Sequence, residues 1–79
     1  MARVLLFGRL SDVAGWRSRD LDSGSIVALR TLLSAEDALL GEALAAPGVQ
    51  VALDQAIVRG DAPLTGRSEV AFLPPMSGG

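Results

Sequence analysis

The sequence lacks several residue types on which enzyme chemistry usually depends, because its 79 residues include no Cys, His, Lys, Tyr or Asn. Without a thiol, no side chain can carry sulfur or form a cysteine zinc site. Without His and Lys, the chain has neither the usual general base near neutral pH nor an amine for a Schiff base or a phosphate clamp. We therefore expect no self-contained active site and no bound metal.

The absence of cysteine also excludes disulfide bonds, so the packing of apolar side chains has to stabilise the fold. Hydrophobic residues make up 49% of the chain and charged residues 20%, which is typical of one small globular domain. The net charge is −2, and the seven basic residues are all arginines, spread along the sequence. Nucleic-acid binders usually concentrate positive charge on one stripe, so we expect no nucleic-acid partner.

Long apolar runs are missing as well. No run approaches the roughly 18 residues that cross a bilayer, and Met1 is followed by a strand-like segment rather than by a signal peptide. We therefore expect a cytoplasmic protein with no membrane contact.

The first part of the chain predicts two strands around a short helix. Residues 4–7 form a continuous apolar run, which is typical of a central strand. Leu10, Val13 and Ala14 recur at helical spacing, and Gly15 follows them as a stop signal. Residues 16–21 alternate between large or apolar and polar side chains, which indicates an edge strand paired antiparallel to the first.

The middle of the chain predicts helices. Ser25 is expected to cap a helix with the apolar stripe Ile26, Leu29, Leu32 and Leu33. Ser34 and Asp37 resemble a capping box for a second helix. The apolar face of this second helix would consist of Leu39, Leu40, Ala43 and Leu44.

After Pro47-Gly48 the pattern becomes strand-like, with strands over residues 49–53 and 56–58 joined by a turn at Asp54-Gln55. A last apolar strand over residues 69–73 ends at two prolines. This order predicts an α+β fold, with a helix packed across one face of a mixed sheet. The first and last strands are the most apolar, so we place them side by side and parallel at the centre.

The C-terminal segment consists of residue types that do not suggest packing: Pro74-Pro75-Met76-Ser77-Gly78-Gly79. Two prolines favour an extended course that leaves the sheet. We expect a domain over residues 1–75 and a flexible tail over 76–79, which could reach roughly 13 Å at about 3.3 Å per residue. Glycines at its end could enter a narrow channel. The alternative is a frayed terminus without a function.

The alternation of the central strands also predicts an apolar surface. Val4, Leu6, Val70 and Phe72 would face the helix, whereas Leu5, Phe7, Ala71 and Leu73 would lie on the other face. Together with Ile57, this second face could be a protein interface. The alternative is that a second helix or a loop covers it.

The whole chain resembles the molybdopterin synthase small subunit family, the ubiquitin-like sulfur carriers of molybdenum cofactor synthesis. The most specific match is residues 69–79, an apolar strand followed by two prolines, a small apolar residue, Ser and Gly-Gly. Residues 4–15 and 51–64 also match, whereas residues 16–48 match only by pattern. Ser11 and Asp54 depart from the family, which often has arginine and asparagine there.

The resemblance implies a ubiquitin-like β-grasp fold and a chemistry located at the chain end. A partner enzyme would use ATP to adenylate the carboxylate of Gly79, sulfur would replace the adenylate, and the resulting thiocarboxylate would donate sulfur to the pterin precursor. Met76, Ser77 and Gly78 would enter the partner with it, and Ser77 would have no base to activate it as a nucleophile. The chain itself would bind no cofactor.

The partners that the resemblance implies are the adenylating enzyme and the large catalytic subunit of the synthase, in a heterotetramer of two small and two large subunits. Phe7, Ile57 and Leu73 align with apolar contact positions of the family. Asp12, Asp61 and Glu69 are expected to be solvated surface acids. The chain would then be a non-catalytic sulfur-donor subunit of an enzyme complex, a sulfurtransferase, rather than an enzyme by itself.

Three other functions fit the same features. Sulfur carriers for thiazole or cysteine synthesis would share the fold and the Gly-Gly end, although Phe72-Leu73-Pro74-Pro75 favours the molybdopterin branch. A ubiquitin-like protein modifier would link its terminal glycine to a lysine, and without lysines this chain could not build chains upon itself. A plain adaptor domain would have an idle tail.

Overall fold

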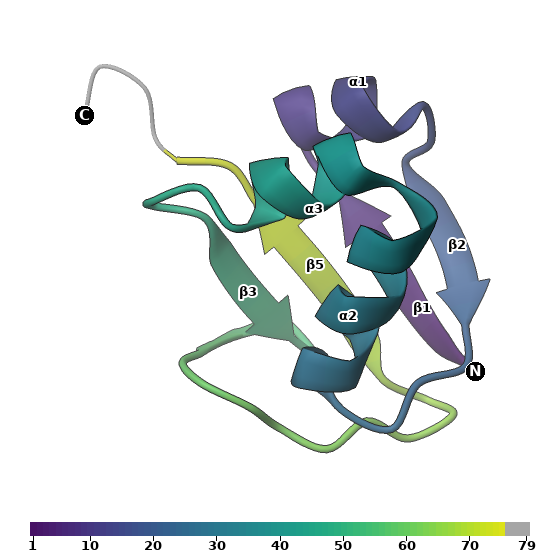
Figure 1. Cartoon of the computed structure of the whole chain (residues 1–79). Coiled ribbons are helices and arrows are strands. Elements are labelled where there is room, and N and C mark those ends of the chain that lie inside the picture. The colour runs from purple at the N-terminus through teal and green to yellow at the C-terminus, as the bar shows by residue number, and fades with distance from the viewer. Residues whose placement is uncertain (76–79) are drawn as a thin grey trace.

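The computed structural model describes residues 1–75, which form one sheet with helices on one side (Figure 1). The strands are β1 (Ala2–Leu6), β2 (Ser18–Leu21), β3 (Gln50–Leu53), β4 (Ala56–Val58) and β5 (Glu69–Leu73). The helices are α1 (Arg9–Ala14), α2 (Ile26–Glu36) and α3 (Ala38–Leu44). The predicted order of elements is therefore confirmed.

The sheet has the strand order β2-β1-β5-β3-β4. β1 and β5 pair parallel at its centre, and every other pair in the sheet is antiparallel. The central parallel pair and the mixed sheet confirm the α+β expectation, and this arrangement is the ubiquitin-like β-grasp fold. The first and last strands of the described chain thus lie side by side.

The core lies between the sheet and α2 and α3. Val4, Leu6 and Phe72 face the helices and are at most 3% exposed, as the alternation predicts. They pack in one cluster with the buried side of the helices, which consists of Ile26, Leu29, Leu33, Leu40 and Leu44. Complete burial of Phe72 on β5 makes the last strand part of the core.

The break between α2 and α3 differs from the prediction. The side chain of Ser25 caps α2 as expected, accepting a hydrogen bond from the Ala28 amide at 3.1 Å. Ser34, however, stays inside α2, and Asp37 is the residue that caps α3, with its Oδ1 atom 3.1 Å from the Leu40 nitrogen. The predicted capping box at Ser34 is therefore wrong. Leu39, which we expected on the apolar face, is 69% exposed.

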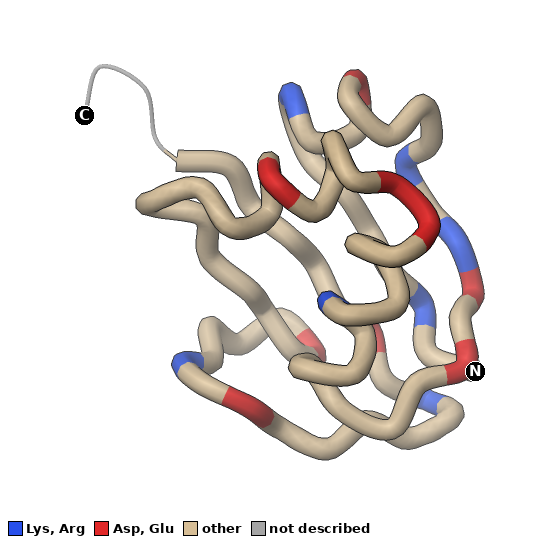
Figure 2. The backbone as a smooth tube through the Cα atoms, viewed as in Figure 1, with Lys and Arg blue, Asp and Glu red and all other residues tan. Residues whose placement is uncertain are grey.

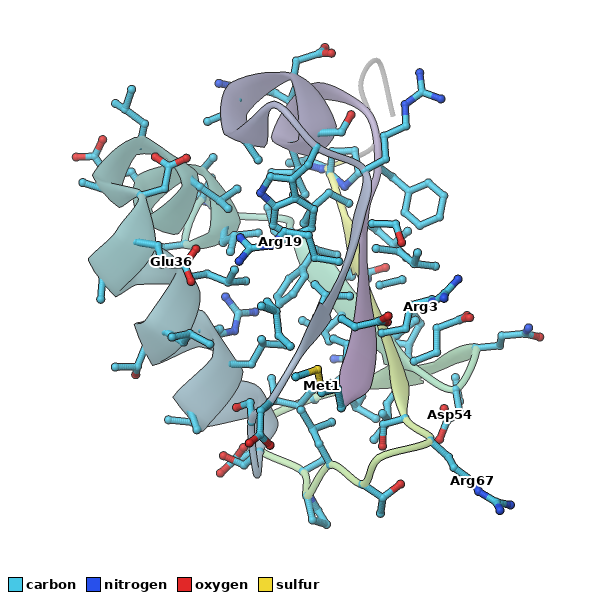
Figure 3. All side chains as sticks on the ribbon, turned by 90° about the vertical axis from the view of Figure 1, so that its right-hand side faces the viewer. Met1, Arg3, Arg19, Glu36, Asp54 and Arg67 are labelled. Atoms are coloured by element: carbon cyan, nitrogen blue, oxygen red, sulfur yellow. The ribbon has the colours of Figure 1, made fainter. Side chains whose placement is uncertain are left out.

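Arginine side chains tie the helices to the rest of the fold. Arg19 on β2 forms an ion pair with Glu36 at the end of α2, with 2.9 Å between Nη1 and Oε1 (Figure 3). The same guanidinium lies 5.1 Å from the ring centre of Trp16. Arg30 on α2 lies over the Phe72 ring at 5.4 Å and donates a hydrogen bond to the Leu44 carbonyl at the end of α3.

Charged residues are unevenly placed along the backbone. Figure 2 shows basic and acidic positions close together on and around β2, whereas the end of β5 and the two prolines after it carry no charge. Within residues 1–75, no helix is long and apolar enough to cross a membrane.

Candidate functional site

The face of the sheet opposite α2 and α3 carries an exposed apolar surface, which we call the open face. Phe7 and Ile57 are its exposed residues, Leu5, Ala71 and Leu73 are half-buried, and Ala52 between them is buried at 8%. The strand register places Leu5, Ala71, Ala52 and Ile57 in one row across β1, β5, β3 and β4. Two alanines occupy the middle of this row, between the larger Leu5 and Ile57. No helix of the described chain covers the row.

The three predicted partner-binding residues all belong to the open face. Phe7 is 46% exposed and Ile57 is 48% exposed, whereas Leu73 is half-buried. Phe7 follows β1, and its amide donates a hydrogen bond to the Phe72 carbonyl at 3.3 Å, which continues the pairing with β5. Leu73 pairs with Gln50 on the other side of β5. Ile57 lies on the edge strand β4, so the three residues span most of the sheet.

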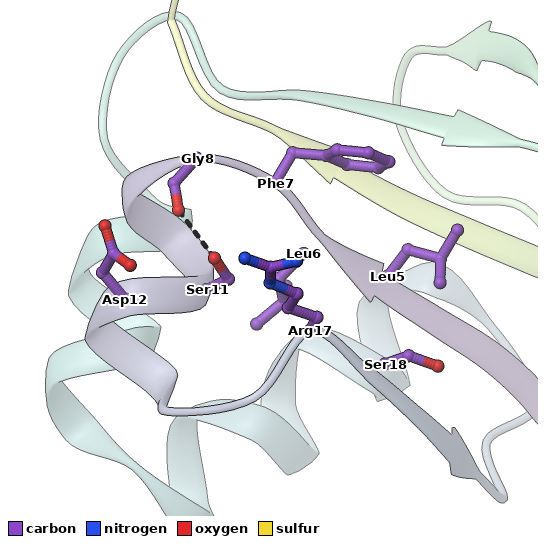
Figure 4. A pocket seen from close by; sticks show the side chains of 8 residues that line it. All are labelled: Leu5, Leu6, Phe7, Gly8, Ser11, Asp12, Arg17 and Ser18. Atoms are coloured by element: carbon purple, nitrogen blue, oxygen red, sulfur yellow. Dashed lines mark hydrogen bonds between the residues drawn. The ribbon is translucent and has the colours of Figure 1, made fainter.

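Phe7 also borders a surface pocket of about 430 Å³ at the junction of β1, α1 and β2 (Figure 4). Residues 5–8, 11–12 and 17–18 line it. Ser11 donates a hydrogen bond from its hydroxyl to the Gly8 carbonyl at 2.8 Å. Figure 4 shows Arg17 directed into the same pocket. The pocket lining thus combines Leu5 and Phe7 of the open face with the positive charge of Arg17 and the negative charge of Asp12.

The end of β5 is the second feature of the site. Pro74 and Pro75 follow Leu73 and lie against two glycines from other segments. A methyl group added to Gly8 would come 3.0 Å from Cγ of Pro74, and one added to Gly48 would come 2.9 Å from Cβ of Pro75. Sequence reasoning missed both glycines, because their role depends on contacts between distant segments.

Of the three expected surface acids, Asp12 and Asp61 are exposed and Glu69 is half-buried. Asp61 accepts hydrogen bonds from the Val27 and Ala62 amides, both at 2.9 Å. Asp54, which was expected in a turn, begins the β3–β4 turn with φ of 50°. Its side chain accepts a hydrogen bond from the Glu69 amide at 2.9 Å, which connects the turn to the start of β5. Residues 1–75 contain no group of three or more acids or histidines that could hold a metal.

The tail residues Met76, Ser77, Gly78 and Gly79 lie outside the described residues. The structure therefore describes the open face and the two prolines that precede residue 76 in the sequence. The open face and the two prolines are adjacent, because Leu73 belongs to the open face and Pro74 follows it directly in the sequence.

Comparison with known proteins adds sequence relatives over the whole chain. Residues 4–79 match the ThiS family. The chain is also 33% identical over 81 aligned positions to the molybdopterin synthase sulfur carrier subunit of Escherichia coli strain K12, with 100% of both chains covered.

Two solved structures with the same fold are archaeal proteins. The solution structure of small archaeal modifier protein 1 from Methanosarcina acetivorans superposes with a TM-score of 0.87 at 19% identity, covering 99% of this chain and 95% of that chain. The crystal structure of small archaeal modifier protein 1 from Haloferax volcanii gives a TM-score of 0.78 at 22% identity, covering 99% and 98%. At these identities the two structures bear on the fold alone.

Proposed function

The chain belongs to the ThiS family, and we propose from this premise that it is the sulfur carrier subunit of a molybdopterin synthase. The observation that carries the proposal is the similarity to the E. coli sulfur carrier subunit across the full length of both chains. The aligned length includes the Gly-Gly end of this sequence. The composition agrees, because a chain without cysteine has no thiol on which to carry sulfur.

In the proposed reaction, Gly79 supplies the group that is activated. A carboxylate is a poor electrophile, so an adenylating enzyme first joins it to AMP at the expense of ATP, releasing pyrophosphate. A sulfur nucleophile then displaces AMP and leaves a thiocarboxylate on Gly79. The large synthase subunit takes up this end, and the thiocarboxylate sulfur forms a bond to a pterin precursor. Water then cleaves the acyl–sulfur bond and restores the Gly79 carboxylate, and a dithiolene needs two such deliveries. Because activation consumes ATP, we expect the carrier to act in the cytoplasm.

The residues of the described chain would dock and orient rather than catalyse. The open face offers Phe7, Ile57 and Leu73 as apolar contacts for the large subunit and the adenylating enzyme. Met76, Ser77 and Gly78 would connect this docked surface to Gly79, and small residues at the end suit a narrow channel. General acids, general bases and the substrate pocket would belong to the partners, in a heterotetramer of two small and two large subunits.

Intact-mass measurement tests the proposal directly. The chain is incubated with ATP, a reduced sulfur source and the adenylating enzyme of its host, and fragmentation locates any change. We expect replacement of one oxygen by sulfur at Gly79, and no change in a variant that lacks Gly79. A wild-type chain that stays unmodified, together with full synthase activity of the shortened variant, would contradict the proposal.

The partners and products that co-purify with the chain distinguish the related functions. Co-purification with a pterin-dependent large subunit supports the molybdopterin branch, whereas a thiazole- or cysteine-forming partner assigns the sulfur to another product. A protein modifier would instead appear as a Gly79 isopeptide on lysines of other proteins. This chain has no lysine to receive such a bond itself.

A further inference from the structure

The two prolines after β5 are held between two neighbouring segments. β1 runs parallel to β5, so the connection that follows β1 lies at the same end of the sheet as the end of β5. β3 runs antiparallel on the other side, so the connection that precedes β3 lies there as well. Gly8 belongs to the first connection and Gly48 to the second. The sheet topology therefore brings one glycine to each side of the chain as it leaves the sheet.

A side chain on either glycine would come into close contact with one of the prolines. A methyl group on Gly8 would lie 3.0 Å from Cγ of Pro74, and its nearest other contacts would be 3.9 Å away on the same ring. A methyl group on Gly48 would lie 2.9 Å from Cβ, 3.3 Å from Cγ and 3.6 Å from Cα of Pro75. Carbon atoms normally approach to about 3.5–4.0 Å, so a methyl group on Gly48 would force a shift of its surroundings. A methyl group on Gly8 would require the Pro74 ring to give way by a few tenths of an ångström.

These contacts are not a by-product of turn geometry. Gly8 and Gly48 have positive φ angles of 57° and 88°, which by themselves favour glycine. Gly15 and Gly60 have similar angles of 82° and 83°, yet a methyl group on either would meet nothing within 4 Å. Within residues 1–75, the positive-φ glycines that closely approach proline are thus the two beside the end of β5.

We propose that Gly8 and Gly48 are positioning residues that hold the Pro74-Pro75 pair and thereby fix where the C-terminal segment leaves the sheet relative to the open face. This inference rests on the proposed function. When the open face docks on a partner, a fixed exit point determines where the four residues after Pro75, which span at most roughly 13 Å, can deliver Gly79. A displacement of about 1 Å at a reacting group can cost on the order of 100-fold in rate.

The kinetic test compares two alanine variants with nearly the same backbone angle. Gly48→Ala introduces the contact with Pro75, whereas Gly60→Ala, at φ of 83° against 88°, introduces no contact. With the adenylating enzyme, we expect Gly48→Ala to lower kcat by about tenfold or more while KM for the carrier stays within about twofold. Gly60→Ala should change neither value by more than about twofold. Equal kcat values for the two variants, or a loss confined to KM, overturn the proposal.

A second variant covers the case in which Gly48→Ala does not fold. Pro74→Ala removes the Cγ atom that lies against Gly8 and leaves every positive-φ position unchanged. It should lower kcat in the same assay, again with an unchanged KM. An unchanged kcat in folded Pro74→Ala contradicts the role of the Gly8 contact.

A structural measurement separates this inference from the function on which it rests. In the wild-type chain, nuclear Overhauser effects should connect the Hα protons of Gly48 with Hβ of Pro75, and those of Gly8 with Hγ of Pro74. If the chain is activated but these effects are absent, the positioning role is wrong and the proposed function stands. If the effects are present but the chain is never activated, the proposed function fails and the delivery role fails with it.

Discussion

Phe7 and Ile57 leave about half of their large apolar side chains in water, at 46% and 48% exposure. Each square ångström of apolar surface removed from water contributes about 25 cal/mol, so a partner that covers both side chains gains free energy. The exposed position of Phe7 follows from the alternation along β1, because its neighbour Leu6 is buried at 3%. Sequence alternation was sufficient to predict which face Phe7 lies on, whereas its role as a partner contact stays a prediction.

Substitution of Phe7 by Asp tests the open face at the scale of one residue. A carboxylate in the apolar contact would lose the buried area and would have to be desolvated. We expect the dissociation constant of the complex with the large subunit to rise about tenfold or more, which corresponds to about 1.4 kcal/mol. Isothermal titration calorimetry measures it.

The matched control is Leu39→Asp. Leu39 is 69% exposed but lies on α3, on the other side of the sheet from the open face. We expect this variant to bind as the wild type does, and both variants to keep the wild-type circular dichroism spectrum. Equal weakening by the two substitutions would show that the open face is not the contact surface.

The glycines at the exit of β5 could not be predicted in the same way. Gly48 was recognisable as the end of a helical pattern, and that pattern says nothing about Pro75. The contacts of Gly8 with Pro74 and of Gly48 with Pro75 form only when β1, β3 and β5 are aligned. They therefore depend on the strand register across the sheet. The shared pocket of Ser11 and Arg17 is a second feature that the sequence pattern did not predict. It depends on how the chain turns back from α1 toward β2.

At the scale of elements, the junction of α2 and α3 shows where local patterns mislead. Ser34 has the spacing of a cap, but the backbone stays helical through Glu36 and becomes extended only at Asp37, with φ of −148°. Asp37 therefore ends one helix and begins the next. The α3 helix can fold back closely because Gly41 lies directly against Ser34. This contact between two helices depends on how they pack, which the spacing of residues in a single sequence does not show.

Substitution of Gly41 by Ala tests this close approach. In an open helix, alanine would stabilise by about 1 kcal/mol relative to glycine. At Gly41, however, the added methyl group would lie 2.6 Å from Oγ and 2.9 Å from Cα of Ser34. The backbone atom cannot rotate away, and overpacking costs about 1–3 kcal/mol. We expect a net decrease in the free energy of unfolding, measured by urea denaturation.

Gly24→Ala serves as the control for this experiment. Gly24 has no positive φ angle, and a methyl group there would meet nothing within 4 Å. Its free energy of unfolding should stay at or slightly above the wild-type value. A Gly41→Ala variant that is as stable as Gly24→Ala would show that α2 and α3 can move apart without cost.

At the scale of the whole molecule, the buried core runs from Ala2 on β1 to Phe72 on β5. The domain boundary after residue 75 was predicted from Pro74-Pro75 and stays a prediction. The overall topology was predictable because the two most apolar strands are also the two central ones. The central strands thus hold both ends of the described chain in the middle of the sheet.

Removal of residues 76–79 tests the boundary. Because every core residue precedes Leu73, we expect the shortened chain to keep its free energy of unfolding within about 0.5 kcal/mol of the wild-type value. It should also fail to incorporate sulfur in the intact-mass assay. The comparison variant also lacks residues 69–75 and should be unfolded, because it has lost β5. If removal of residues 76–79 alone greatly lowers the free energy of unfolding, the predicted domain boundary after residue 75 is wrong.

The central position of β5 has a consequence for biosynthesis. Translation makes β1 early and β5 only after all the other elements of the described chain, yet the two strands must pair with each other. Such contacts between distant residues form late in folding. A nascent chain that breaks off before Glu69 lacks Phe72 and leaves one side of β1 without a partner, so it stays open to proteases. Only chains that have been translated at least to the end of β5 can therefore fold, and the proposed sulfur-carrying Gly79 follows β5 after residues 74–78.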